Sequence, residues 1–253
     1  MHDIARAGKM VRMLVPKFSS PISSAKTAGP RLAVVILLQC LVLCAAHAGC
    51  SDAPAAGVDW SGCEKARLIL RKAELQGSKL AGTTMNGSDF AQANLSGSDL
   101  TRASVERARF SGADLDRAKL VRMIAYRGNF TGAKLAGADL SKAELMRSNF
   151  AGANLSNANL EKAELQRATM DGAVLAGANL TGTDLARTSF VKANMAGARL
   201  AQARMFLTRI EGVDLSAAQG MVQSQLDSAC GSSQTKLPKG LKAPPSWPCA
   251  KEE

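Results

Sequence analysis

Residues 138–157 read ADLSK AELMR SNFAG ANLSN, and this stretch decides the fold. A large apolar residue stands at every fifth position, and the same spacing runs from Trp60 to Leu215 with Lys65 and Ala125 as the exceptions. A small residue, nearly always Ala, Ser, Thr or Gly, stands two places before each of them. A helix repeats every 3.6 residues and a strand every 2, so neither could keep these positions on one buried face.

A period of five with two inward and three outward positions requires a chain that turns a corner at every repeat. Four such corners close a coil of 20 residues. The phenylalanines at repeat centres all share one residue class modulo 20, namely Phe90, Phe110, Phe130, Phe150 and Phe190. We expect them to form an internal ladder, continued by Met170 and Ile210, with rings offset between coils. Near Ala125 the large residue has moved to Met123, which conserves core volume.

The repeated unit has the form A(D/N)LXX, as in AELQG at 73–77, AKLAG at 133–137 and ANLTG at 178–182. In these units the chain resembles the pentapeptide-repeat family. The resemblance implies an all-β fold, a right-handed quadrilateral β-helix of about eight coils over residues 58–217. The flanking pieces VDWSGC, QLDSACG and TKLPKGL are similar to those of exported members of the family.

Residues 1–48 have the pattern of a signal peptide. The apolar run Leu32–Ala46 follows six basic residues and ends in Ala46-His47-Ala48, the order of charged, apolar and small residues that secretory signals show. We expect cleavage after Ala48 and a periplasmic or secreted mature protein. Two alternatives stay open, an uncleaved signal anchor and lipidation of Cys50, and only these would attach the protein to a membrane.

Removal of residues 1–48 changes the net charge and the histidine content of the mature chain. The 253 residues carry a formal net charge of +11 and only 4% aromatic residues. The leader holds six of the 32 basic residues and one of the 21 acids, so the mature chain keeps 26 basic and 20 acidic residues, or +6. Both histidines also lie in the leader. The mature protein would therefore lack serine triads, Cys-His pairs and histidine metal sites, and we expect no cofactor and no metal.

The repeat needs a cover at its N-terminal end, because an uncovered coil would expose the apolar interior. Residues 49–57 form this N-terminal cap, and Trp60 is large enough to plug the first coil. Four cysteines remain after cleavage, namely Cys50, Cys63, Cys230 and Cys249. A disulfide needs α-carbons within ~7 Å, and the solenoid separates its two ends by several times that distance. Within one chain, only Cys50 with Cys63 and Cys230 with Cys249 can pair.

Residues 218–253 form the C-terminal cap. We expect a short amphipathic helix over 221–230, followed by a proline-rich strap over 235–249 that Trp247 anchors. This tail should also cover the apolar pair at 206–207.

The outward residues form columns under the same modulo-20 rule. One corner of the coil carries Arg107, Arg127, Arg147, Arg167 and Arg187, and the preceding corner carries Arg102, Arg122, Lys142 and Lys162. The other two corners are mostly glycine, which suits turns that need a positive φ. The sequence therefore predicts one side of the solenoid with two basic ridges.

Between the ridges, Tyr126 and Met146 point outward beside the acids Glu144, Glu164 and Asp184. One interpretation makes this side a docking strip for an unknown protein or an anionic envelope polymer. The other makes it an exposed ladder in which each acid offsets an arginine three residues later, with little stability gained per pair.

Three functions compete. We favour a non-catalytic exported scaffold that binds a partner through the basic side. The resemblance also suggests a DNA-mimicking topoisomerase (gyrase) inhibitor, but mimicry needs a strongly acidic, cytosolic solenoid. A β-helical polysaccharide-active enzyme is the third, although a four-sided coil of 20 residues encloses no cleft. Export and the scarcity of interleaved aromatics argue against nucleic acid. End-to-end dimers occur in the family, so the resemblance also allows a homodimer.

Overall fold

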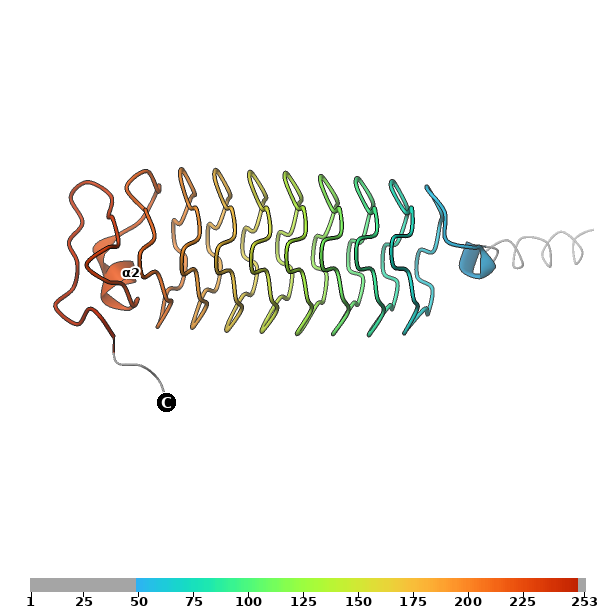
Figure 1. The fold of residues 1–253 in the computed structure, drawn as a ribbon, viewed down its shortest axis with the longest axis horizontal. Coiled ribbons are helices and arrows are strands. Elements are labelled where there is room, and N and C mark those ends of the chain that lie inside the picture. Colours follow the sequence, from blue (N-terminus) through green and yellow to red (C-terminus); the bar gives the residue numbers. More distant parts are fainter. Residues whose placement is uncertain (1–48, 250–253) are drawn as a thin grey trace, which may run out of the picture. The chain divides into compact units, whose positions relative to one another are not determined.

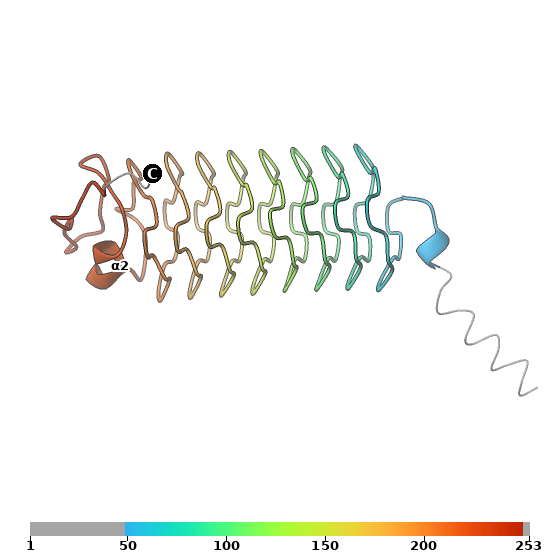
Figure 2. The same ribbon diagram turned by 90° about the horizontal axis from the view of Figure 1, so that it is seen from below.

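The chain winds into a four-sided, right-handed parallel β-helix in a computed structural model that describes residues 49–249 (Figures 1 and 2). The predicted leader 1–48 lies outside the described residues. Each side of a coil contributes one isolated parallel bridge to the next coil, and the partners differ by 20 residues from Asp59–Lys79 to Arg199–Gln219. No longer strand forms because the chain turns again after every bridge. The predicted all-β solenoid is confirmed.

Backbone hydrogen bonds join each coil to the coils before and after it. The Asn94 N–H donates to the Ala73 carbonyl at 2.9 Å, and the Leu95 N–H donates to the Asp114 carbonyl at 2.7 Å. The corners are joined in the same way, as the Gly97 N–H donates to the Asp116 carbonyl at 2.9 Å. A coil can therefore satisfy its polar backbone groups only between two neighbours.

The corners depend on a left-handed residue in each repeat. Gly132 has a φ of +63°, and Arg127, one repeat earlier, has a φ of +56°. Glycine enters this region without a steric penalty, whereas a residue with a Cβ loses roughly 1–2 kcal/mol there. Each corner with a side chain is therefore less favourable for the backbone than the same corner with glycine.

The phenylalanines stack in one column inside the solenoid. The ring centroids of Phe90 and Phe110, and of Phe110 and Phe130, lie 4.8 Å apart, and those of Phe130 and Phe150 lie 4.6 Å apart. The rings are parallel within 4° and fully buried, which is the geometry of an offset stack. Their spacing is also the spacing between coils. The predicted aromatic ladder is confirmed.

The two exceptions to the repeat have physical reasons. Met123 and Ala125 are both fully buried, so the large and the small inward side chain have changed places within one coil. Lys65 occupies a centre next to the N-terminal end, and its Nζ lies 4.2 Å from the centroid of the Trp60 ring. This cation–π contact lets the ammonium group remain partly solvated while its stem covers the ring.

The N-terminal cap closes over Trp60, which is fully buried. The indole Nε1–H of Trp60 donates to the Asp52 carbonyl at 3.2 Å. A disulfide joins Cys50 to Cys63, with 5.6 Å between the α-carbons. The indole and the disulfide together hold residues 49–57 against the first coil.

The C-terminal cap contains helix α2, Gln223–Asp227, which is shorter than the helix predicted over 221–230. Its key residue is Gln225, which is buried and whose Nε2–H₂ group donates to the carbonyls of Leu200 at 2.8 Å and Ala203 at 2.9 Å. The Leu200 carbonyl also accepts the Ala203 N–H within its own coil at 3.1 Å, whereas the Ala203 carbonyl would otherwise face the backbone donor of a further coil. At Ala203 the side chain of Gln225 thus replaces the missing backbone donor.

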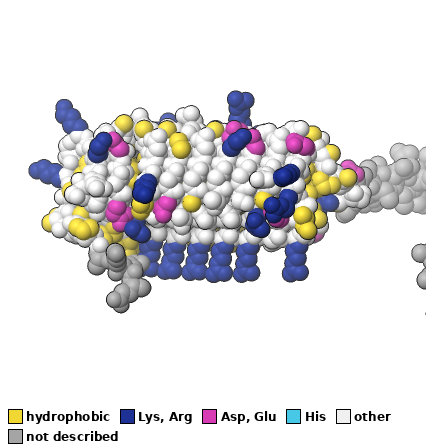
Figure 3. Space-filling view, in the orientation of Figure 1, with side chains coloured by type: hydrophobic (Ala, Val, Ile, Leu, Met, Phe, Trp, Pro, Cys, Tyr) yellow, Lys and Arg dark blue, Asp and Glu magenta, His cyan; other side chains and the backbone are white. Residues whose placement is uncertain are grey.

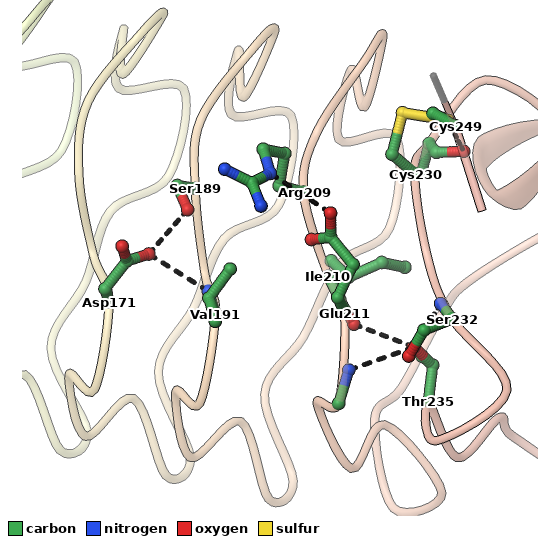
Figure 4. Close-up of polar contacts among 12 residues, drawn as sticks. Asp171, Ser189, Val191, Arg209, Ile210, Glu211, Cys230, Ser232, Thr235 and Cys249 are labelled. Carbon is green, nitrogen blue, oxygen red and sulfur yellow. Dashed lines mark hydrogen bonds and ion pairs between the residues drawn. A yellow bond between two sulfur atoms is a disulfide. The ribbon is translucent and has the colours of Figure 1, made fainter. Parts of the chain in front are cut away.

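Beyond residue 217 the coil continues with extra residues instead of stopping. Arg209 bridges Cys230 and Asp214 bridges Lys236, which are separations of 21 and 22 residues in place of 20. The Thr235 hydroxyl donates to the Ile210 carbonyl at 2.9 Å and accepts from the Gly212 N–H at 3.3 Å (Figure 4). The C-terminal cap therefore begins as one irregular coil.

The proline-rich tail is fastened to this irregular coil. The Trp247 Nε1–H donates to the Ala229 carbonyl at 2.7 Å, and a disulfide joins Cys230 to Cys249 with 5.3 Å between the α-carbons. The tail does not cover Phe206, which keeps 57% of its surface exposed, so that part of the prediction is wrong. The strap closes the end of the solenoid and leaves the side that carries Phe206 open.

Replacing Phe130 by alanine should lower the free energy of unfolding by about 3–5 kcal/mol, because it removes a fully buried ring that stacks on both sides. Chemical denaturation followed by circular dichroism measures the loss. The matched control is Phe206→Ala at the exposed position, which should change stability by less than about 0.5 kcal/mol. Equal losses in the two variants would contradict a stabilising role for the stack.

Replacing Gln225 by alanine should cost about 1–3 kcal/mol, because it leaves the Ala203 carbonyl without a donor and removes the second donor of the Leu200 carbonyl. Hydrogen exchange should speed up in the last coils first, as expected if the end of the solenoid opens. Ser224→Ala, at an exposed position of the same helix, is the control and should leave exchange unchanged. Protection that survives Gln225→Ala would show that the cap does not need this side chain.

Candidate functional site

The basic residues predicted from the sequence lie in two adjacent columns on the surface. Column A consists of Arg102, Arg122, Lys142 and Lys162, and column B consists of Arg107, Arg127, Arg147, Arg167 and Arg187. All nine are exposed. The corners beneath them are bonded coil to coil, as where the Arg102 N–H donates to the Val121 carbonyl at 2.9 Å. We call the side between the two columns the basic face. Figure 3 shows basic side chains projecting in a comb along one edge of the solenoid.

All nine column residues occupy the left-handed region, with φ between 55° and 60°. The corners on the opposite side place glycine at most of the equivalent positions, as at Gly132 and Gly152. The sequence thus accepts an unfavourable backbone conformation at these nine positions. Other corners also carry a side chain in this region, among them Gln92, Asn157 and Leu207, so what distinguishes the nine is the unbroken run of cations in two columns.

Most of these side chains have no acidic partner. Within residues 49–249, no ion pair within 4.0 Å is made by seven of the nine, namely Arg102, Arg107, Arg122, Arg127, Lys142, Arg147 and Arg167. Lys162 pairs with Glu161 at 3.4 Å between exposed groups. The interpretation that each acid offsets the arginine three residues later therefore fails for Glu144 with Arg147 and for Glu164 with Arg167.

The acids of the basic face bind other groups. The Tyr126 hydroxyl donates a short hydrogen bond to the Glu144 carboxylate. Asp184 accepts from the Gln166 Nε2–H₂ group at 2.9 Å and pairs with Arg204 at 2.9 Å. These contacts engage two of the acids away from the basic columns, which leaves the column charges available to an external anion.

Tyr126 and Met146, expected to point outward between the columns, both lie half-buried beside column B. The hydrogen bond to Glu144 raises the pKa of Tyr126 from its ordinary value of 10 to about 12, with smaller contributions from burial and from the Glu144 charge. The phenol is therefore neutral at physiological pH and acts as a donor that holds the Glu144 carboxylate in place.

The sequence prediction missed one member of column B. Arg67 belongs to the same residue class modulo 20 and also has a positive φ, of 60°, but Gly87 separates it from Arg107. The modulo-20 rule could have found it, since only the interrupting glycine hides it. Column B is therefore longer than predicted, with one gap.

Two further properties of residues 49–249 bear on function. In this part of the chain, no cluster of three or more His, Cys, Asp or Glu side chains could hold a metal ion. The same residues contain no helix long and apolar enough to span a membrane.

A family model described as pentapeptide repeats (8 copies) matches residues 69–107, 88–122, 129–167 and 168–205. The chain belongs to the pentapeptide-repeat family. The matched segments include every residue of the two columns except Arg127, and the coil register is unbroken there, so the columns are built on the repeats themselves and not on an insertion.

Solved structures of other pentapeptide-repeat proteins are similar to this chain. QnrB1, a plasmid-mediated fluoroquinolone resistance protein, is 17% identical over 70% of this chain and 92% of its own, with a TM-score of 0.46. HetL, a pentapeptide repeat protein involved in heterocyst differentiation regulation from the cyanobacterium Nostoc, is 25% identical over 79% of this chain and 96% of its own, with a TM-score of 0.31. No curated protein sequence matches the chain.

The single tyrosine of this pentapeptide-repeat protein provides a direct test of the Tyr126–Glu144 contact. Its absorbance should titrate near pH 12, and Glu144→Gln should return the midpoint toward 10. Because the folded pKa is raised, the contact stabilises the fold fully below pH 10, and this stabilisation is lost as the pH rises toward 12. A midpoint that Glu144→Gln does not move would exclude the carboxylate as the cause.

Proposed function

We propose that this pentapeptide-repeat protein is a non-catalytic, exported scaffold that binds an anionic partner along its basic face. The observation that carries the proposal is the placement of arginine and lysine at nine left-handed corners, seven of them without an ion pair in the described residues. Stability alone would favour glycine at each corner. A ligand that needs the cations gives a reason for the side chains.

Two features support export. Both ends of the described chain carry a disulfide, Cys50–Cys63 and Cys230–Cys249, and such bonds persist in oxidising compartments. The leader pattern at 1–48 leads to the same compartment. The proposed location is therefore the periplasm or the exterior of the cell.

The charge of the surface favours an anionic partner over mimicry of DNA. A mimic presents acids where DNA presents phosphates, whereas here the two continuous columns are cationic. Each column places one positive charge on every coil, and successive coils are 4.8 Å apart, as the spacing of the stacked phenylalanine rings shows. Cations this close together repel one another, and a bound anion relieves that repulsion.

The test compares two triple variants that remove the same charge and the same backbone strain. The first, Arg127→Gly with Arg147→Gly and Arg167→Gly, removes the centre of column B. The second, Lys72→Gly with Arg117→Gly and Lys192→Gly, acts at left-handed corners away from the basic face, where φ is 56°, 55° and 61°. Both should keep or raise the free energy of unfolding, by up to about 1 kcal/mol per residue.

Only the column B variant should elute at lower salt from an immobilised carboxylate matrix, because only it disrupts a continuous row of cations. The control variant should elute close to the wild type. If both variants shift equally, retention follows net charge and the basic face has no special role.

A further inference from the structure

A shallow groove runs along the corner that carries column A. It is lined by Ala81, Gly82, Thr101, Arg102, Val121, Arg122, Ser141 and Lys142 and has a volume of about 540 Å³. These residues come in adjacent pairs from four successive coils, so the groove is parallel to the solenoid axis. At 4.8 Å per coil, its length is about 14 Å.

The floor of the groove exists because the residue before each of Arg102, Arg122 and Lys142 has a short, uncharged side chain. Thr101, Val121 and Ser141 occupy this position. At the corner of column B, the same position holds a long side chain in every coil except the last, where it is Ala186. Among the long ones is Tyr126, which is fixed there by its bond to Glu144. From Arg107 to Arg167, column B therefore lacks the floor of short side chains that lies beside Arg102, Arg122 and Lys142.

The groove has two defined ends. Gly82 provides no side chain at one end. Beyond Lys142, the next coil places Glu161 at the floor position and pairs it with Lys162 at 3.4 Å. Three cations, those of Arg102, Arg122 and Lys142, are thus left unpaired in the described residues along a recess of limited length.

Resting on the proposed function, we infer that this groove binds a linear acidic polysaccharide with one carboxylate per sugar, its chain parallel to the solenoid axis. A sugar unit extends such a chain by a distance close to one coil spacing, so successive carboxylates meet successive cations. Guanidinium groups bind carboxylates through paired, charge-assisted hydrogen bonds. The hydroxyls of Thr101 and Ser141 can bond sugar hydroxyls, and Val121 offers an apolar floor to a sugar ring.

Nucleic acid fits the groove less well. Duplex DNA carries one charge per ~1.7 Å of its axis, which is far denser than one cation per coil. Single strands bind by stacking on aromatic side chains, and none of the residues that line this groove is aromatic. Charge spacing and the lining both favour the polysaccharide.

The experiment is calorimetric titration of the full chain with oligogalacturonates from the disaccharide to the octasaccharide. Affinity should rise with length until three carboxylates are bound and then level off. The variant Arg102→Gly with Arg122→Gly and Lys142→Gly should bind at least tenfold more weakly. Val121→Trp, which fills the floor without changing charge, should also weaken oligosaccharide binding tenfold but leave elution from the carboxylate matrix unchanged.

Controls separate this inference from the proposed function. The Lys72, Arg117 and Lys192 triple variant should bind the oligosaccharides like the wild type. If Val121→Trp and the column A variant bind as tightly as the wild type, or affinity keeps rising with length, the groove is not the site, although salt-dependent binding through column B would survive. The proposed function would be overturned as well if neither the column A variant nor the column B variant eluted from the carboxylate matrix at lower salt than the wild type.

Discussion

A left-handed residue at every corner is the constraint on which the rest of the molecule depends. It turns the chain after each bridge, so that two side chains per repeat point inward and the next coil lies in register 20 residues later. Without that turn, the backbone donors of one coil would not meet the carbonyls of the next. The hydrogen-bond ladder, the phenylalanine stack and the surface columns all follow from the same local geometry.

The coil also places different constraints on inward and outward side chains. Inward positions are fixed by volume, as the exchange of size between Met123 and Ala125 shows. Outward positions are limited only by the preference of the corner for glycine. A row of like side chains can therefore be placed along one corner without disturbing the core, and the size of the preceding residue decides whether a groove or a ridge forms.

Most of the fold could be predicted from the sequence because one period governs 160 residues. Arithmetic modulo 20 places Phe90 above Phe110 and Arg127 above Arg147, and the ends of the solenoid restrict which cysteines can meet. The same arithmetic fails where residues are inserted, as between Arg209 and Cys230, and so it could not give the bounds of α2 or the exposure of Phe206.

The candidate site was predicted only as two columns of charge. Whether Glu144 pairs with Arg147 or with Tyr126 depends on side-chain conformations that no spacing rule contains. The groove was missed because it is defined by an absence, the lack of large side chains at Thr101, Val121 and Ser141. The modulo-20 rule also places Thr101, Val121 and Ser141 in one column, so the groove could have been predicted from these short side chains.

The position of the two disulfides has a consequence for how the protein resists degradation. A solenoid ordinarily frays from its terminal repeats, because those have one neighbour instead of two. Here each end is covalently closed, by Cys50–Cys63 on one side and Cys230–Cys249 on the other. Opening from either end must then release a whole cross-linked cap at once instead of one residue after another, and a protease finds few free ends to attack.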